Sequence, residues 1–275
     1  MKNRSRHLTA RYLSGLLGRC VLKPSFYLIG AQKSGTTSLF SHLIRHPCIL
    51  EPLGKEIHYF YENYCRDRHW YESWFPSTSQ KPPDSNGNCI TGDGSTGYLF
   101  EPHTPARIRA YTPDAKFIAI LRNPIERAYS AYQHEVRKRG ETRTFDEVVR
   151  DELGWMEKEY RNVLDHPLTF NRRFHFQSHL RRGYYAEQLK RWFELFPRDQ
   201  FLILCGDEFF SDPGSIYERT IEFLSLPEYP LNGFKPHNVG GYCSKLSDET
   251  RQFLEEHYAP LNQELYDLLG IDYGW

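Results

Sequence analysis

The chain has 275 residues, of which 39% are hydrophobic and 15% aromatic, enough for the core of one large domain. It carries 35 Lys and Arg residues and 35 Asp and Glu residues, so its formal net charge is zero. A neutral chain has no overall attraction for nucleic acid, so we expect no nucleic-acid partner and only local anion sites. No window has the roughly 18 apolar residues that indicate a membrane-spanning helix, so we expect no integral membrane segment.

The first 23 residues are basic and contain only a short apolar patch at 13–17, which is too weak for a signal peptide. We interpret residues 1–23 as a basic tail or surface helix and residues 24–275 as one domain. The six cysteines include no C-x-x-C pair, and their number alone does not argue for disulfides in a chain of this length. We therefore expect a cytoplasmic protein; the Golgi lumen, for a truncated anchored enzyme, is the alternative.

The first clear element is an apolar run at 26–30, which predicts a buried strand. A loop from Gly30 to Gly35 follows, and then an apolar stripe that predicts a helix from Thr36 to Arg45. A strand, a glycine loop and a helix form an arrangement that binds phosphate, because loop and helix N–H groups point toward the anion.

This loop differs from the ATP and GTP loop, whose pattern is G-x-x-x-x-G-K-[ST]. Gly30 and Gly35 have the right separation, but Thr36 stands where the lysine should be, and Lys33 lies inside the loop. An ordinary nucleoside triphosphatase is therefore disfavoured. A P-loop kinase, which remains the alternative, also needs an acidic metal ligand after a strand, where this chain has Arg122.

Further along the chain, strands and helices alternate. We expect strands at 90–95, 116–121 and 201–205, and helices at 105–111, from Asn123 to Gly140, from Thr144 onward, at 185–196, at 215–224 and from Ser247 onward. The segment 153–179 has no clean period and is interpreted as either a substrate-facing insertion or a surface excursion. The alternation predicts an α/β fold with a parallel sheet covered on both faces.

Several polar side chains follow the predicted strands. Because ligands bind beyond the carboxyl ends of parallel strands, we expect the Lys33 loop, the Glu56 segment and Arg122 to converge there. Ser130 lies two turns into the helix after Arg122, roughly on the face of its N-cap. An arginine and a hydroxyl group at a helix start form a second anion site.

Three motifs now stand in order: Lys-Ser-Gly-Thr-Thr at 33–37, Lys-Glu-Ile-His-Tyr-Phe at 55–60, and Leu-Arg-Asn-Pro-Ile-Glu-Arg-Ala-Tyr-Ser-Ala-Tyr at 121–132. This order resembles the sulfotransferases that use PAPS (3′-phosphoadenosine 5′-phosphosulfate). The likeness is to the heparan sulfate and glycosaminoglycan N- and 3-O-sulfotransferases and their bacterial relatives. It implies a P-loop-like three-layer fold with a central parallel sheet flanked by helices.

The resemblance also implies roles for individual residues. The 5′-phosphosulfate would be bound by Lys33, Ser34, Gly35, Thr36 and Thr37, and the 3′-phosphate by Arg122 and Ser130. Glu56 would be the catalytic base, with Lys33 and His134 as the other catalytic residues. A loop that covers the cofactor would contain Gly241 and Tyr242, with Lys245 after it.

Some readings stay open beside these roles. Glu56 is either the base or an ion-pair partner of Lys55, and His58 is either a rival base or a ring packed among aromatic residues, which we prefer. The aromatic residues Tyr61, Trp70, Trp74 and Trp155 are candidates for sugar stacking or core residues. The basic residues Arg172, Arg173, Arg181 and Arg182 either contact an anionic glycan or, as we prefer, form a solvated face.

The function implied is transfer of a sulfuryl group from PAPS to a hydroxyl group or amine of an acceptor, releasing adenosine 3′,5′-bisphosphate (PAP). We expect a carbohydrate or glycan acceptor. No metal ion is required, because lysine and backbone donors neutralise the charge. A small-molecule or lipid acceptor and a non-catalytic nucleotide-binding module are the alternatives; the site of sulfation and the oligomeric state are not specified by the sequence.

Overall fold

The computed structural model describes residues 8–9, 11–13, 20–80, 89–235 and 245–275, and its centre is a parallel β-sheet. The strands are β1 (Phe26–Gly30), β2 (Gly92–Asp93), β3 (Lys116–Leu121) and β4 (Phe201–Cys205), in the order β2-β1-β3-β4. All neighbouring pairs are parallel, with Leu28 opposite Ile118 and Phe117 opposite Phe201. The expected parallel α/β fold is confirmed.

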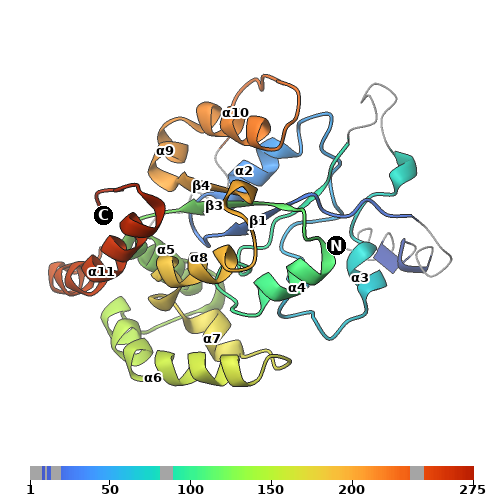
Figure 1. The fold of residues 1–275 in the computed structure, drawn as a ribbon. Coiled ribbons are helices and arrows are strands. Elements are labelled where there is room, and N and C mark those ends of the chain that lie inside the picture. The colour runs from blue at the N-terminus through green and yellow to red at the C-terminus, as the bar shows by residue number, and fades with distance from the viewer. Residues whose placement is uncertain (1–7, 10, 14–19, 81–88, 236–244) are drawn as a thin grey trace.

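Helices cover both faces of this sheet (Figure 1). They are α2 (Thr36–Leu43), α3 (Arg68–Glu72), α4 (Thr104–Tyr111), α5 (Pro124–Arg139), α6 (Phe145–Asp165), α7 (Arg172–Gln177), α8 (Tyr185–Phe193), α9 (Gly206–Ser211), α10 (Pro213–Phe223) and α11 (Asp248–Leu269). Short 3₁₀ helices lie at Thr78–Gln80, Arg181–Gly183 and Arg198–Gln200. Within the part of the chain that is described, none of these helices combines the length and the hydrophobicity needed to cross a membrane.

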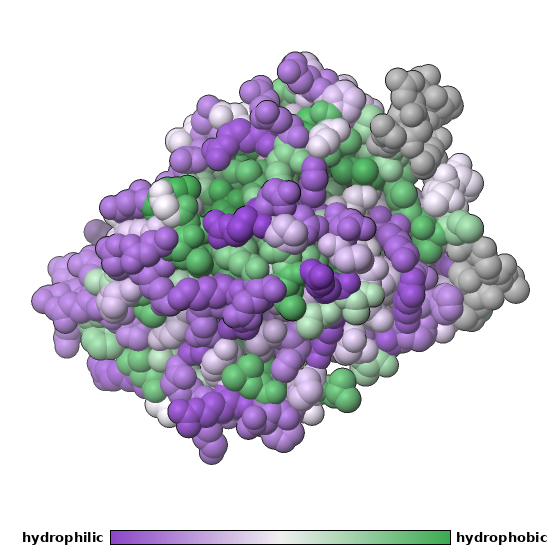
Figure 2. Space-filling view, in the orientation of Figure 1, coloured by the Kyte–Doolittle hydropathy of each residue, from purple (hydrophilic) through white to green (hydrophobic). Residues whose placement is uncertain are grey.

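The two faces of the sheet have separate cores, because alternate strand residues point to opposite sides. Phe26, Leu28 and Ile118 belong to a buried cluster with side chains of α2, α9 and α10. Tyr27 and Phe117 belong to another, with side chains of α4 and α8. On the face drawn in Figure 2, hydrophilic side chains predominate, with hydrophobic patches between them. The outer helices therefore turn their apolar faces toward the sheet.

Below the α8 side of the sheet in Figure 1, α6 and α7 form an additional layer. The segment 153–179, which showed no clean period, contains the second half of α6 and all of α7. Trp155, Met156 and Val163 are buried there. Polar residues interrupt the apolar ones, so the helical pattern was not visible in the sequence. Two residues of α7, His175 and Phe176, line a cavity beyond the sheet, and a contact of this segment with substrate stays a prediction.

Capping residues mark where several of the helices begin. Asn123 caps α5 and Thr144 forms a reciprocal capping box with Glu147 at α6, as predicted. Helix α2 begins at Thr36 as expected but ends at Leu43 rather than Arg45. From β1 the chain runs to β2 on one side and then to β3 on the other. This reversal leaves a crevice beyond the carboxyl ends of β1 and β3.

Candidate active site

The first corner of the site is the turn from β1 into α2. Gly35 is the N-cap of α2 with φ 93°, and Lys33 also has a positive φ, 69°. A Cβ on Gly35 would come within 2.7 Å of the Phe209 side chain, so glycine is required for space as well as for backbone conformation. The first N–H groups of a helix lack partners within it, and Gly35 has no side chain to cap them. They are therefore available to an anion.

Polar side chains surround this corner. The Ser34 hydroxyl is buried and has no hydrogen-bond partner among the described residues. Lys55 donates from Nζ to the hydroxyl oxygens of Thr36 and Thr37, each at 3.2 Å. Burial, together with the positive charges of Arg137 and Arg122, lowers the pKa of Lys33. The corner thus concentrates positive charge that an anionic ligand would stabilise.

The second corner is the turn from β3 into α5. Arg122 donates from a guanidinium nitrogen to the Lys33 carbonyl at 3.2 Å, which ties the two corners together. The Tyr185 hydroxyl donates to the Arg122 carbonyl at 2.9 Å and fixes the backbone there. Ser130 is buried on α5 and His134 lies one turn further along. Burial and then Lys33 lower the pKa of His134, so its neutral form is favoured.

Glu56 and His58 form the third part of the site. Both adopt left-handed backbone conformations, with φ of 61° and 55°, which is uncommon for residues other than glycine and clusters at functional sites. The Glu56 carboxylate accepts a hydrogen bond from the Thr96 N–H at 3.0 Å and lies 3.6 Å from Lys55 Nζ. Nδ1 of His58 is 3.7 Å from the carboxylate. The Glu56 carboxylate is thus held in place, while about one third of the Glu56 side-chain surface remains exposed.

One cavity of about 710 Å³ joins these parts. The predicted site residues that line it are Lys33, Gly35, Thr36, Thr37, Glu56, Arg122, Ser130 and His134. Ser34 lies buried beneath the loop. Lys245 is exposed and is not among the residues that line this cavity, and its contact with the cofactor stays a prediction. Gly241 and Tyr242 lie outside the described residues.

Sequence reasoning missed a group of residues behind Glu56. The Tyr61 hydroxyl hydrogen-bonds to Nδ1 of His58, and the Tyr61 ring stacks on His175 with centroids 4.9 Å apart. Nε2 of His175 is 2.7 Å from the Glu101 carboxylate, and both side chains are buried. His175 lines the cavity from α7. The preferred interpretation of His58 as a ring packed among aromatic residues agrees with its contact to Tyr61, whose ring centroid lies 5.1 Å away. The part that the sequence did not indicate is the contact of Tyr61 with His175.

The arginine cluster also differs from the preferred expectation. Arg172 and Arg173 are exposed, as a solvated face predicts, but Arg181 and Arg182 are buried. Arg182 donates to the His175 carbonyl at 2.7 Å and lies 4.3 Å above the Phe100 ring. These contacts replace water around the guanidinium, and burial lowers its pKa to about 10. A long side chain can bury its charge in this way when backbone carbonyls and aromatic faces meet it.

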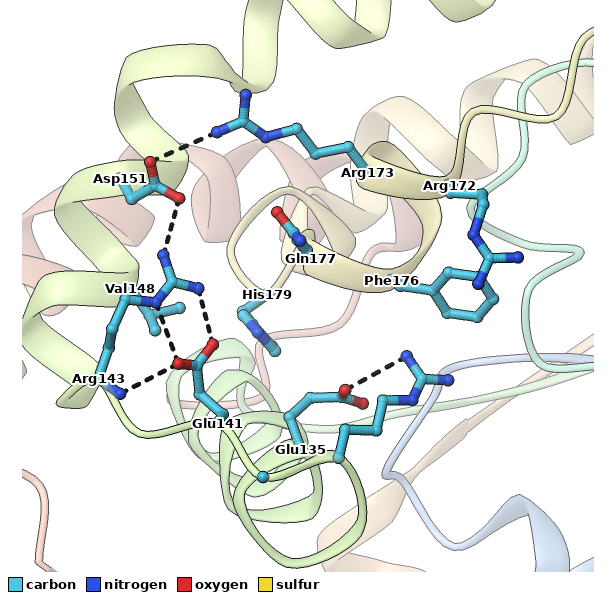
Figure 3. A pocket seen from close by; sticks show the side chains of 12 residues that line it. Glu135, Glu141, Arg143, Val148, Asp151, Arg172, Arg173, Phe176, Gln177 and His179 are labelled. Atoms are coloured by element: carbon cyan, nitrogen blue, oxygen red, sulfur yellow. Dashed lines mark hydrogen bonds and ion pairs between the residues drawn. The ribbon is translucent and has the colours of Figure 1, made fainter.

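A second cavity, of about 930 Å³, adjoins the first and shares Glu135, Arg139, Phe176 and His179 with it. It lies between the end of α5, the start of α6 and helix α7 (Figure 3). His179 is buried there, and burial lowers its pKa to about 3, so it is neutral. The molecule therefore has two adjoining cavities, the first of which contains Glu56.

The fold and these motifs define a sulfotransferase. A model of the sulfotransferase domain family matches residues 23–237, so the chain belongs to this family. It is an enzyme that transfers sulfuryl groups, and enzymes of the family use PAPS. The kinase and the non-catalytic module are thereby set aside.

Particular relatives agree with this assignment. Human heparan sulfate glucosamine 3-O-sulfotransferase 6 is 28% identical, over 92% of this chain and 73% of that protein. Mouse bifunctional heparan sulfate N-deacetylase/N-sulfotransferase 4 is 30% identical, over 91% of this chain but 30% of that longer protein. The crystal structure of a sulfotransferase from Alicyclobacillus acidocaldarius matches with a TM-score of 0.70 and 29% identity, over 92% of this chain and 98% of that one.

Proposed function

We propose that this enzyme transfers the sulfuryl group of PAPS to a hydroxyl group or amine of a carbohydrate acceptor and releases PAP. The observation that carries the proposal is that both anion-binding corners and the Glu56 carboxylate line one cavity. The names of the relatives support a carbohydrate acceptor, since they act on heparan sulfate.

The residues of the cavity fit PAPS. The uncapped start of α2, with Lys33, Thr36 and Thr37, suits the 5′-phosphosulfate. Ser34 is buried and does not line the cavity, so a contact from its hydroxyl to the ligand stays a prediction. Arg122 and Ser130 suit the 3′-phosphate. The distance of Arg122 from the loop is fixed by its bond to the Lys33 carbonyl, so the two phosphate sites are held in one relative position.

PAPS supplies the sulfuryl group, and the residues of this chain prepare the acceptor and the charge. Glu56 accepts the proton of the attacking hydroxyl group or amine, a contribution of roughly 10²–10⁴-fold. Lys33 and the loop N–H groups stabilise the negative charge that develops on the phosphate as it leaves. His134 lines the cavity in its neutral form and can position the acceptor by hydrogen bonding.

Thermal unfolding separates cofactor binding from chemistry. PAP at 100 times its dissociation constant should stabilise the protein by about 2.7 kcal/mol, and ATP with magnesium should not. Glu56→Gln should keep this stabilisation while losing sulfuryl transfer from PAPS to saccharides. Stabilisation by ATP with magnesium alone would refute the proposal, as would full activity of Glu56→Gln.

A further inference from the structure

The wall of the second cavity is rich in charged side chains, but their charges almost cancel. Arginines and carboxylates alternate around its wall: Arg139, Arg143, Arg172 and Arg173 with Glu135, Glu141 and Asp151. His179, at the boundary with the first cavity, is neutral. A groove built for a polyanion would carry unpaired cations, so the pairing of each arginine decides what the cavity can bind.

Arg143 is fully engaged. It donates from Nε to Glu141 at 3.0 Å and from a terminal nitrogen to the same carboxylate at 2.7 Å, and its other terminal nitrogen reaches Asp151 at 3.1 Å (Figure 3). The bond from Arg143 lowers the pKa of Glu141 to about 2. Bidentate pairing of this kind holds both partners in fixed positions. Arg143 would therefore have to give up these bonds to contact an acidic ligand.

Two more arginines have carboxylate partners. Arg173 lies 3.4 Å from Asp151, and Arg139 lies 3.2 Å from Glu135. Arg172 is different: it is exposed, and no described residue forms an ion pair with it. Its guanidinium lies 5.2 Å from the ring of Phe176, beside which Figure 3 shows it. Among the described lining residues, Arg172 is the arginine without a carboxylate partner, whereas Arg139, whose guanidinium lies 4.4 Å from the same ring, is paired with Glu135.

Arg172 lines the second cavity beside Phe176. Phe176 lines both cavities, and the first one contains Glu56. The paired carboxylates and Gln177 offer acceptors and donors to the hydroxyl groups of a sugar. Because these carboxylates already neutralise three of the arginines, the wall offers little net attraction to a chain that carries many acidic groups.

We propose that the second cavity binds the non-reacting part of a hydroxyl-rich saccharide with at most one acidic group, which Arg172 contacts beside Phe176. This inference rests on the proposed function and deepens it. It predicts a different acceptor from that of the relatives that act on heparan sulfate. A highly sulfated chain needs several unpaired cations, and three of the four arginines in this cavity are paired with carboxylates.

Three tetrasaccharides test the charge preference with PAPS as donor. They are an uncharged N-acetylglucosamine tetrasaccharide, the same chain ending in a single glucuronate, and a highly sulfated heparin tetrasaccharide. We expect sulfation of the first two with similar kcat, little dependence of KM on ionic strength for the uncharged one, and poor use of the third. The highest kcat/KM for the heparin tetrasaccharide, falling steeply with salt, would overturn the proposal.

Arg172→Gln sharpens the test, with Arg161→Gln as its matched control. Arg161 is an exposed arginine of α6 that lines neither cavity. Arg172→Gln should raise KM for the glucuronate-bearing chain about tenfold, the effect of losing one charged hydrogen bond, and leave kcat and the uncharged chain unaffected. Arg161→Gln should change neither. An equal rise of KM for the charged and uncharged chains would contradict a role for the Arg172 charge.

Binding of PAP distinguishes failure of this inference from failure of the proposed function. If PAP stabilises the protein but no tetrasaccharide is sulfated, the saccharide class is wrong while the cofactor site stands. If PAP does not stabilise the protein, the proposed function fails, and this inference fails with it.

Discussion

Two helices start at the carboxyl edge of the sheet, and their N-termini are built in opposite ways. At α2, Gly35 supplies no capping side chain and the first turn contains no acidic residue. At α5, the Asn123 side chain accepts hydrogen bonds from the N–H groups of Ile125 and Glu126, and Glu126 adds a negative charge to the first turn. The first N-terminus is open to an anion, whereas the second is already satisfied.

The difference shows how one fold could form the two proposed phosphate sites by different means. At α2 the backbone N–H groups would contact the anion, which requires a residue without a side chain at Gly35. At α5 the backbone is occupied, so the side chains of Arg122 and Ser130 would have to bind the anion. Substitutions at the two corners should therefore have different signatures in rate, affinity and stability.

The largest effect is expected for Lys33→Ala at the open corner. Removing one preorganised group that stabilises developing charge lowers kcat by about 10²–10³-fold. Steady-state kinetics at saturating PAPS measures this, with Lys138→Ala as control, since Lys138 is an exposed lysine of α5 outside both cavities. If Lys33→Ala instead raised only the KM for PAPS, the lysine would bind ground state and transition state equally.

Arg122→Ala should affect binding rather than rate. Loss of a charged hydrogen bond to phosphate weakens PAP binding by about 1.5–3 kcal/mol, or roughly 10- to 160-fold. Calorimetry with PAP and with adenosine 5′-phosphate, which lacks the 3′-phosphate, locates the effect. The variant should discriminate poorly between the two ligands, whereas the unaltered enzyme prefers PAP. A similar loss for both ligands would place Arg122 at the 5′ side.

A third, smaller effect concerns the histidine between the corners. Burial and then Lys33 depress the pKa of His134, and an anion bound nearby opposes that depression. If the pKa of His134 rises when PAP binds, PAP binds more tightly at pH values where the histidine is protonated. This gain in affinity is lost as the pH rises through the pKa that His134 has in the complex. Protonation of the ligand's own phosphates acts in the opposite direction near pH 6. The comparison with His134→Gln isolates the histidine, whose contribution should be absent from the variant.

Much of this arrangement was visible in the sequence, and the reason is local. Continuous apolar runs predicted β1, β3 and β4, and Asn123 followed by Pro124 predicted the start of α5. Gly35 and Lys33 predicted the open corner because a phosphate loop is encoded in consecutive residues. Each of these signals lies within one short segment.

The remainder depends on contacts between distant segments. Lys55 turns toward Thr36 and Thr37, some twenty residues away in the chain. Tyr61 meets His175 only because α7 folds over the site. Neither contact has a period or a spacing that marks it in the sequence. The same holds for burial of Arg182, which required the Phe100 ring.

The smallest effect, and the most direct test of the comparison, is Asn123→Ala. Loss of the cap should destabilise the fold by about 1 kcal/mol, which lowers Tm by about 2–4 °C in a chain of this size. Ser247→Ala is the matched control, because Ser247 caps α11, away from both cavities. Both variants should lose similar stability and bind PAP as the unaltered enzyme does. If Asn123→Ala alone changed PAP affinity, the N–H groups of α5 would belong to the anion site. The N-termini of α2 and α5 would then both bind an anion, and the Asn123 cap would not prevent it.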